Sequence, residues 1–215
     1  MRFVLRHMHA WSKKSAPETG HLKHAPLRGD ALGRYKIQIV GNSGTGKSTL
    51  GRWLAAELRV PFFALDEIHW RPGWQDTPMD EFRAKVAAVM DAHPEGWIID
   101  GDYKRPMKDL VSGAATDIIW LDPPLVLYFP RLVLRTARRL FGRAPPCAAG
   151  CQEEWPECIT RKGILWWALT NHAVVRTRYG ARGFEHGGKL RRLGGWGGAL
   201  DAWKREVRVL AASAR

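Results

Sequence analysis

The chain of 215 residues is 45% hydrophobic and 26% charged, the ordinary balance of a soluble globular domain with a substantial core. No run of 18 apolar residues exists, and three cysteines are too few for a disulfide scaffold, so we expect a cytoplasmic protein with no membrane partner. The formal net charge of +13 excludes no class alone, because a basic balance suits nucleic acid, an anionic membrane surface or anionic substrates.

Residues 1–34 show no helix or strand pattern. They hold seven Lys or Arg against two acidic residues, and Pro, Ser, Gly and four His interrupt any hydrophobic period. Such a composition buries too little apolar surface to fold, so we expect a basic, disordered leader before one domain over residues 35–215. A flexible tail, an organelle address and translation begun upstream of the true start all stay open for this leader.

A phosphate-binding loop is the strongest motif of the chain. A short β-branched run is formed by Ile37, Ile39 and Val40. The pattern G-x-x-x-x-G-K-[ST] then follows over residues 41–48 and is filled by Gly41, Gly46, Lys47 and Ser48. Glycine permits backbone angles at which successive N–H groups wrap an anion, and the following helix adds the positive end of its dipole. The residues expected to contact the nucleotide phosphates are Gly41, Asn42, Ser43, Gly44, Thr45, Gly46, Lys47, Ser48 and Thr49.

The loop predicts a nucleoside triphosphate with magnesium as its ligand. Lys47 should reach the β and γ phosphates, and the Ser48 hydroxyl should ligate Mg²⁺. An amphipathic run after the loop, with Leu50, Leu54 and Leu58 on one face, supports a helix there.

A carboxylate follows the second apolar run, residues 60–65. In an open parallel sheet ligands bind beyond the carboxyl ends of the strands, so Asp66 should point toward the phosphate loop. There it can accept a proton from an attacking hydroxyl, orient a substrate or hold magnesium through water; an N-cap or a surface charge is the alternative. His69, Trp70 and Trp74 are further candidate substrate contacts, although the two tryptophans would serve equally well to plug the edge of a lid.

The third strand, residues 96–100, also ends in an aspartate. A carboxylate at the end of such a strand suits the Mg²⁺ water shell, and residues 118–122 have the same shape. Because Asp122 precedes Pro123 and a helical pattern, helix capping explains it, so we choose Asp100 with Ser48 as the magnesium site. Candidate substrate contacts around this strand end are Asp100, Tyr103, Lys104 and Arg105, the last two of which would equally suit an exposed basic loop.

An arginine-rich helix is expected over residues 125–141. Arg131, Arg135 and Arg138 share one helix face, and Arg139 follows Arg135 by one turn. One interpretation is a solvated basic face. The other is a lid, roughly residues 138–162, whose Arg138, Arg139 and Arg143 neutralise the transferring phosphoryl group.

The rest of the chain supplies further elements of the lid and sheet. Cys147, Cys151 and Cys158 lie in the lid loop, but their gaps do not match a zinc knuckle, so metal binding there stays an open alternative. Residues 162–179 form a helix for core and lid packing or, less simply, a base-stacking platform. A fifth strand over residues 189–193 and a last helix, residues 200–210, complete the domain.

These motifs together resemble P-loop kinases of the nucleoside monophosphate and shikimate kinase group. The resemblance is closest to the adenylate-kinase-related bacterial kinases described as FlaR-like or DNA topology modulation proteins. It is carried by residues 41–49, 65–74 and 97–103, with residues 119–122 and 150–153 extending it. It implies an α/β P-loop NTPase three-layer sandwich with a five-stranded parallel sheet and a helical lid insertion, binding ATP and Mg²⁺.

One departure from adenylate kinases proper affects the expected acceptor. Those enzymes carry Asp-Gly-Phe-Pro-Arg where residues 100–104 read Asp-Gly-Asp-Tyr-Lys, so the arginine that grips an acceptor nucleotide is missing. Asp66 lies where shikimate-kinase-like members keep a carboxylate for a hydroxyl. We therefore expect an ATP:acceptor phosphotransferase acting on a hydroxyl, as a monomer or weak dimer. A nucleic-acid-associated ATPase or polynucleotide-end kinase, and a non-catalytic nucleotide-binding protein, are the alternatives.

Overall fold

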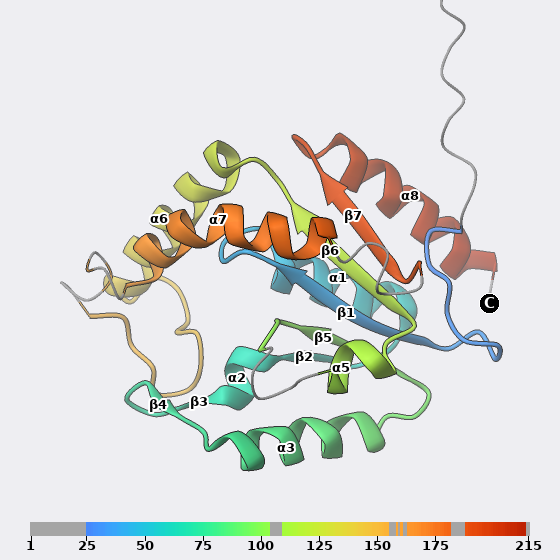
Figure 1. Ribbon diagram of the computed structural model, residues 1–215, viewed down its shortest axis with the longest axis horizontal. Helices are drawn as coiled ribbons and strands as arrows, with labels where there is room; N and C mark the ends of the chain where they lie inside the picture. The colour runs from blue at the N-terminus through green and yellow to red at the C-terminus, as the bar shows by residue number, and fades with distance from the viewer. Residues whose placement is uncertain are drawn as a thin grey trace, which may run out of the picture.

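The computed structural model describes residues 25–103, 109–154, 158, 160, 163–181 and 188–213. Its centre is a parallel sheet of five strands in the order β2-β5-β1-β6-β7 (Figure 1). The strands are β1 (Tyr35–Gly41), β2 (Phe62–Ala64), β5 (Gly96–Asp100), β6 (Asp117–Asp122) and β7 (Leu190–Gly194).

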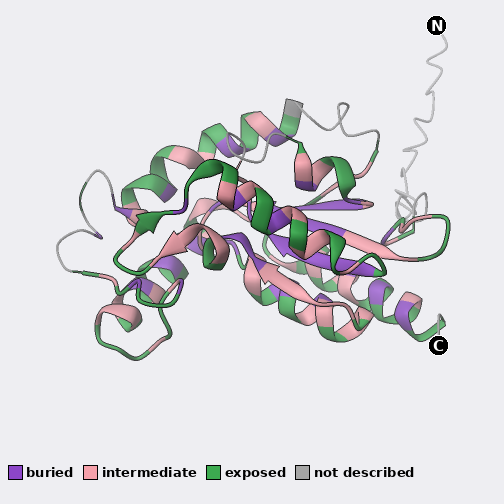
Figure 2. Cartoon of the chain, turned by 90° about the horizontal axis from the view of Figure 1, so that it is seen from below, coloured by how far each residue is buried: buried purple, intermediate pink, exposed green. Residues whose placement is uncertain are grey.

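The central strands are buried because helices cover both faces of the sheet. Every residue of β5 and β6 is buried, as the near-continuous apolar runs of a parallel sheet require (Figure 2). On one face lie α1 (Lys47–Leu58) and α8 (Gly198–Ser213), and on the other α3 (Met79–Asp91), α5 (Leu110–Ala114) and α7 (Ile164–Ala181). This architecture confirms the predicted three-layer α/β sandwich.

Two insertions lie beside the ends of the strands. The first is α2 (Leu65–His69) with an antiparallel hairpin of β3 (Trp70–Arg71) and β4 (Gln75–Asp76). The second lies between β6 and β7: α6 (Leu125–Leu140) packs against α7, and residues 141–163 connect them (Figure 1). No helix within the described ranges is long and apolar enough to cross a bilayer.

The folded part includes residues 25–34, which the sequence analysis assigned to the leader. Leu27 is 2% exposed, and the main-chain N–H groups of Arg28 and Gly29 donate to the Asp117 carboxylate at 2.8 and 3.1 Å. The Trp203 indole donates to the Pro26 carbonyl at 2.8 Å. The expected start near residue 35 is therefore ten residues too late. A segment with few apolar residues can still pack on the domain when distant residues, here Asp117 and Trp203, bind its main chain. Residues 1–24 lie outside the described part.

Candidate functional site

The phosphate loop connects β1 to α1, and three of its glycines have positive φ. These angles are 147° at Gly41, 84° at Gly44 and 99° at Gly46. A Cβ at Gly41 would lie 2.6 Å from the Leu121 carbonyl oxygen, so the sheet itself leaves no room for a side chain there. No side chain caps α1, which begins at Lys47, so its first-turn N–H groups are available to an anion.

Asn42 holds the loop from behind. Its amide nitrogen donates to the Tyr128 hydroxyl at 2.7 Å and to the Ala168 carbonyl at 2.8 Å, and its side-chain oxygen accepts from the N–H of Ser43 at 2.8 Å. The Thr45 hydroxyl donates to the Asn42 carbonyl at 2.8 Å. The buried Asn42 and Thr45 side chains therefore shape the loop, which leaves its main chain to face a ligand.

Lys47, Ser48 and Asp100 meet at the carboxyl ends of β1 and β5. The Ser48 hydroxyl donates to Asp100 Oδ2 at 2.5 Å, and Lys47 Nζ lies 4.0 Å from Asp100 Oδ1 and 3.3 Å from the Asn42 carbonyl oxygen. Burial raises the pKa of Asp100, while the charge of Lys47 and the hydrogen bond from Ser48 oppose that rise. A hydroxyl beside a carboxylate is the oxygen donor set that Mg²⁺ prefers, so these residues fit that ion.

Asp122, the other aspartate at a strand end, is bound to arginines. It accepts hydrogen bonds from Arg192, whose guanidinium also lies 4.9 Å from the Trp120 ring centre, and it pairs with Arg176 at 3.3 Å. The N-cap residue of α6 is Pro124, and no side chain forms a capping hydrogen bond at this end of the helix. The capping interpretation of Asp122 is therefore wrong, and the structure places Asp100, not Asp122, beside Ser48.

Asp66 lies in the first turn of α2, directly after β2. The Tyr103 hydroxyl donates to its Oδ1 at 2.5 Å, and the Cys147 thiol donates to its Oδ2 at 3.6 Å. The Asp66 charge also helps to raise the pKa of Asp100, so the two carboxylates interact across the site. Burial, followed by the Asp66 charge, raises the pKa of Cys147 to about 12 and the pKa of Tyr103 well above its usual value.

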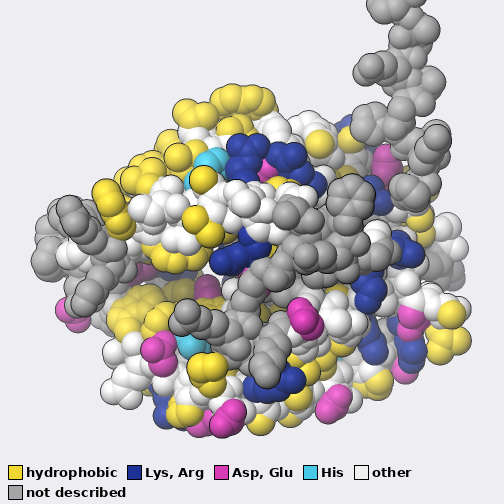
Figure 3. Space-filling model, in the orientation of Figure 1, with side chains coloured by type: hydrophobic (Ala, Val, Ile, Leu, Met, Phe, Trp, Pro, Cys, Tyr) yellow, Lys and Arg dark blue, Asp and Glu magenta, His cyan; other side chains and the backbone are white. Residues whose placement is uncertain are grey.

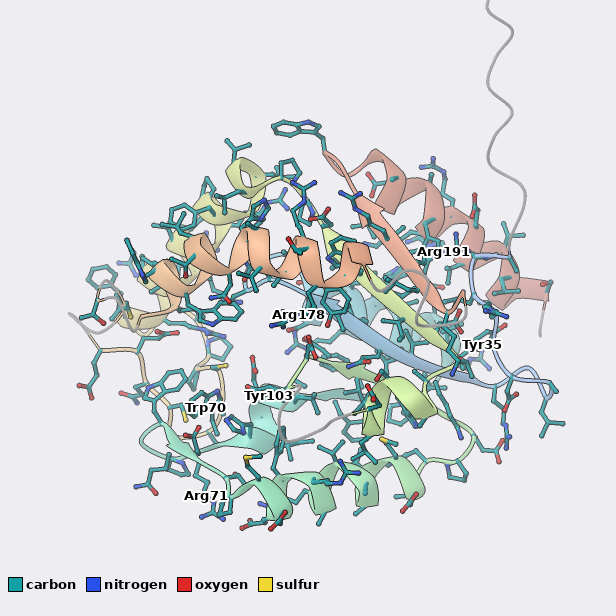
Figure 4. The ribbon with its side chains drawn as sticks, in the orientation of Figure 1. Tyr35, Trp70, Arg71, Tyr103, Arg178 and Arg191 are labelled. Carbon is teal, nitrogen blue, oxygen red and sulfur yellow. The ribbon has the colours of Figure 1, made fainter. Side chains whose placement is uncertain are left out.

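Aromatic rings pack around Tyr103. The His69 ring lies 4.5 Å from it and 4.9 Å from Phe82, and the His69 and Trp70 rings lie 4.8 Å apart, all measured between ring centres. His69 Nε2 lies 3.0 Å from an Asp76 carboxylate oxygen, whereas its Nδ1 is buried without a hydrogen-bond partner. Figure 4 shows Trp70 and Tyr103 below α7, on the side of the site that holds Asp66. The aromatic cluster fixes Tyr103, and through it Asp66.

Residues 144–154 bridge α6 and the β3–β4 hairpin; we call them the strap. The Trp74 indole donates to the Gln152 carbonyl at 2.7 Å, the N–H of Gly73 donates to Gly150 at 2.9 Å, and the Cys151 thiol donates to the Arg71 carbonyl at 3.2 Å. Of the two uses expected for Trp74, its bond to the strap matches the plugging of a lid edge.

The arginines of α6 divide into two groups. Arg135 Nη2 donates to Ser43 Oγ at 3.2 Å, and its Nε is buried without a partner; burial, then the Arg139 charge, lowers its pKa. Arg139 donates to the Pro145 carbonyl at 3.0 Å and pairs with Glu153 at 3.3 Å. Arg138 and Arg143 are exposed. Of the predicted Arg138, Arg139 and Arg143, Arg139 is the one whose side chain binds the strap within the described part of the chain.

Arg135 is the residue that sequence reasoning left out of the site. It follows the buried Leu132 by three residues and precedes the buried Thr136 by one, so it lies at the border of the inner face of α6. The spacing of Arg135 from the apolar residues of α6 could therefore have indicated from the sequence that its side chain faces the site. Two predicted substrate contacts, Lys104 and Arg105, lie outside the described residues.

A cavity of about 530 Å³ lies beside the hairpin, away from the phosphate loop. Trp70, Arg71, Lys85 and Ala149 are among its lining residues. Neither Lys47, Asp66 nor Asp100 lines it, so the candidate chemistry belongs to the strand ends and not to this cavity.

The chain is an α/β protein with a parallel five-stranded sheet and a glycine-rich loop between its first strand and first helix. No protein-family model matches the chain. It is 29% identical over 149 residues to a shikimate kinase of Bradyrhizobium diazoefficiens, covering 69% of this chain and 55% of that protein. It is 28% identical over 85 residues to the pentafunctional AROM polypeptide of Schizosaccharomyces pombe, covering 34% of this chain and 5% of that protein. The chain thus spans about half of one relative and a small part of the other.

Solved structures of small-molecule kinases are also similar. A gluconokinase from Sinorhizobium meliloti has 17% identity and a TM-score of 0.46, covering 84% of this chain and 94% of that one. A sugar kinase from Janibacter has 18% identity and a TM-score of 0.48, covering 83% and 93%. The narrower resemblance to adenylate-kinase-related bacterial kinases stays a prediction.

Proposed function

We propose that the chain is an ATP-dependent phosphotransferase that moves the γ-phosphoryl group of ATP to a hydroxyl of a small-molecule acceptor. The observation that carries this proposal is the pairing of two sites. The phosphate loop adjoins the Ser48–Asp100 pair, and a second carboxylate, Asp66, is close enough to act on the pKa of Asp100. The similarity to a shikimate kinase supports the same chemistry.

The donor side would bind the triphosphate. Main-chain N–H groups of residues 41–49 would bind the β and γ phosphates, and Lys47 would neutralise part of their charge. Ser48 and Asp100 would hold Mg²⁺, which supplies charge neutralisation at the β and γ oxygens. The buried contacts of Asn42 keep this cradle in shape before the nucleotide arrives, so little reorganisation is needed on binding.

The acceptor side would position the hydroxyl. Tyr103 holds Oδ1 of Asp66 at 2.5 Å, whereas Oδ2 accepts only the longer 3.6 Å contact from the Cys147 thiol. The acceptor hydroxyl would displace that thiol and donate its hydrogen bond to Oδ2. In the reaction the hydroxyl oxygen bonds to the γ-phosphorus while the bond from that phosphorus to the β–γ bridging oxygen breaks. The hydroxyl proton passes to Asp66, and ADP leaves.

Arginine would stabilise the transferring group. Arg135 reaches the phosphate loop at Ser43, and its buried Nε has a hydrogen to donate that no described residue accepts. An oxyanion at the γ position would satisfy that donor. Arg139 holds the strap through Pro145 and Glu153, so it would act chiefly by positioning. This assignment replaces the exposed Arg138 and Arg143 as transition-state contacts.

The proposal retains several sequence predictions. ATP with Mg²⁺, a hydroxyl rather than a phosphate as acceptor, a cytoplasmic location, and a monomer or weak dimer all stay as predictions. The proposal names a class of acceptor and not a compound, because the names of the similar kinases describe the substrates of those proteins alone.

A transfer screen tests the proposal. γ-Labelled ATP and Mg²⁺ are incubated with the full chain and separate pools of sugars and polyols, hydroxylated ring acids, nucleosides, nucleoside monophosphates and oligonucleotides. We expect label on a hydroxyl compound and no transfer by Lys47→Ala. Label on a nucleoside monophosphate or on an oligonucleotide end would contradict a small-molecule hydroxyl as the acceptor. ATP binding with no transfer in any pool would favour a non-catalytic nucleotide-binding protein.

A further inference from the structure

Large hydrophobic side chains are exposed on the outer face of α6. Val126, Val133, Leu134 and Phe141, just past the end of the helix, are 66, 40, 52 and 76% exposed. Their spacings of seven, eight and fifteen residues from Val126 place them on one stripe of the helix. The opposite face packs into the protein through Tyr128, Leu132 and Thr136. The inner face of α6 already packs on the domain, so packing within the domain does not explain the exposed hydrophobic stripe.

The neighbouring helix α7, which packs against α6, also exposes hydrophobic side chains. Trp166, Trp167, Leu169 and Val174 are exposed, while Ala168, Val175 and Tyr179 are buried against the body of the domain. Eight of the twelve exposed large hydrophobic side chains in the described part of the chain thus belong to α6, its C-cap and α7. Figure 3 shows hydrophobic side chains gathered over these two helices. We call this surface the α6–α7 face.

The charges of the α6–α7 face have one sign. Neither helix contains an acidic residue. Arg131 and Arg138 lie beside the stripe on α6, Arg143 follows it, and all three are exposed. Among the described residues no acidic side chain forms an ion pair with these three. An apolar stripe with aromatic residues, bordered by unpaired arginines, is the composition of helices that lie in an anionic lipid interface.

We propose that the α6–α7 face docks on the surface of an anionic lipid bilayer, with the apolar stripe at the level of the headgroups and the arginines on lipid phosphates. The proposal is independent of phosphotransfer. It departs from the sequence-based expectation of no membrane partner, which rested on the absence of a membrane-spanning run and not on the surface of the fold.

Charge disfavours a second copy as the occupant. A two-fold interface through this face would set Arg131, Arg138 and Arg143 against the same arginines, with no acid on either helix to separate them. Nucleic acid suits the arginines but not the stripe. Phe141, Trp166 and Trp167 suit bases as well as lipid, so the five aliphatic residues of the face decide between the two. Val126, Val133, Leu134, Leu169 and Val174 neither stack on bases nor bind phosphate, whereas acyl chains accept them.

Vesicle co-sedimentation of the full chain tests the proposal. We expect binding to vesicles of phosphatidylcholine with phosphatidylglycerol, little binding to phosphatidylcholine alone, and release when NaCl rises from about 0.1 M to about 1 M. The triple variant Arg131→Gln, Arg138→Gln, Arg143→Gln should bind about a hundredfold more weakly, at roughly fivefold for each cation near the surface. The variant Leu134→Ser, Phe141→Ser should also lose binding, although its charge is unchanged.

A matched charge control uses the opposite face of the sheet. Arg59→Gln, Arg205→Gln, Arg208→Gln removes the same charge from the end of α1 and from α8, and should weaken binding less than about threefold. An equal loss in both triple variants would mean that net charge alone attracts the chain, and would overturn the docking face.

Fluorescence reports insertion without relying on a destabilised variant. Brominated acyl chains in the anionic vesicles should quench part of the tryptophan emission of the unaltered chain. That quenching should fall in Trp166→Phe, Trp167→Phe, which stays apolar. Absence of vesicle binding overturns the proposal. So does self-association that Leu134→Ser, Phe141→Ser abolishes, which would assign the face to a second copy, or oligonucleotide binding that persists while vesicles are ignored.

Discussion

The two sides of the candidate site are built differently. On the donor side, Lys47 and Ser48 open α1 directly after the loop that follows β1, and Asp100 ends the adjacent strand β5, in a register that pairs Ile39 with Asp100. On the acceptor side, Asp66 follows the short edge strand β2 and is held by Tyr103 and Cys147, which come from two other segments. Main-chain pairing thus sets the donor geometry, and side-chain contacts between loops set the acceptor geometry.

The two kinds of construction suit two kinds of ligand. A phosphate cradle made of main chain on a rigid sheet suits a ligand common to many enzymes, because the polyphosphate is the same whatever the acceptor. An acceptor site made of side chains on a hairpin and a strap can change its specificity without disturbing the sheet. Substitutions on the two sides should therefore fail in different ways.

The largest effect should come from the donor side. Lys47→Ala should lower the transfer rate by about a thousandfold or more, because the ammonium neutralises charge on the leaving and transferring phosphates. Transfer of label from ATP measures it. Lys85→Ala, a change of equal size on the outer surface of α3, should leave the rate unchanged. A rate within tenfold of the unaltered protein for Lys47→Ala would contradict the assignment.

Asp66→Asn should separate the two sides most sharply. We expect transfer to fall by about a hundred- to a thousandfold through loss of the proton acceptor, while the affinity for ATP with Mg²⁺ stays within about twofold. Calorimetry gives the affinity, and the transfer assay gives the rate. Equal losses of transfer rate and of ATP affinity would place Asp66 on the donor side and contradict the division of the site into two sides.

Arg135 and Arg143 form a matched pair on one arginine-rich segment. Arg135→Ala should lower the transfer rate by about a hundredfold, because its buried Nε donor has no other partner, whereas Arg143→Ala should change the rate by less than about twofold. The original prediction from the sequence favoured Arg143. If Arg143→Ala is the slower enzyme, the helix turns a different face to the nucleotide during the reaction.

Alkylation of Cys147 tests the contact between the strap and Asp66. Its pKa of about 12 predicts slow reaction with iodoacetamide at neutral pH, because only the thiolate attacks. Asp66→Asn removes a charge that raises this pKa, so it should speed alkylation several-fold, as peptide mass spectrometry can follow. The rate at Cys158, which contacts Glu153 instead, provides the internal control. An unchanged rate at Cys147 would mean that thiol and carboxylate are apart in solution.

Asp100 should give the smallest effect, on stability. Its folded-state pKa is raised, chiefly by burial, so the native state binds its proton more tightly than the unfolded state does. The contribution to stability is therefore favourable below the unfolded pKa and is lost as pH rises through the folded one. Asp100→Asn should raise the melting temperature of the ligand-free protein near neutral pH and flatten this pH dependence. A lower melting temperature would show that Lys47 and Ser48 outweigh the cost of burial.

The sequence predicted the donor side better than the acceptor side for physical reasons. A phosphate loop is a local pattern, since the positive φ angles at Gly41, Gly44 and Gly46 follow from residue types at fixed spacing. Asp100 could be predicted because parallel strands end at the same edge of the sheet. The five strands and the central core follow from apolar runs, which the three-layer packing then buries.

The misplaced residues depend on contacts that no local pattern carries. The rotation of α6 against the loop decides whether Arg135 or its neighbours face the site, and Leu132 packing near Gly44 sets that rotation. Asp122 looked like a helix cap because Arg192 lies seventy residues away in the chain. The strap meets the hairpin through Trp74 and Gln152 in the same nonlocal way.

The early segment that packs on Asp117 constrains how the domain is completed during protein synthesis. Its hydrogen bonds join residues 88, 89 and 177 positions apart, so Pro26 emerges from the ribosome long before the indole of Trp203 exists. The segment can dock only after β6 and α8 have been made. Closure of the domain is therefore a late, post-translational event, and a nascent chain that stalls before α8 would leave Leu27 exposed to chaperones and proteases.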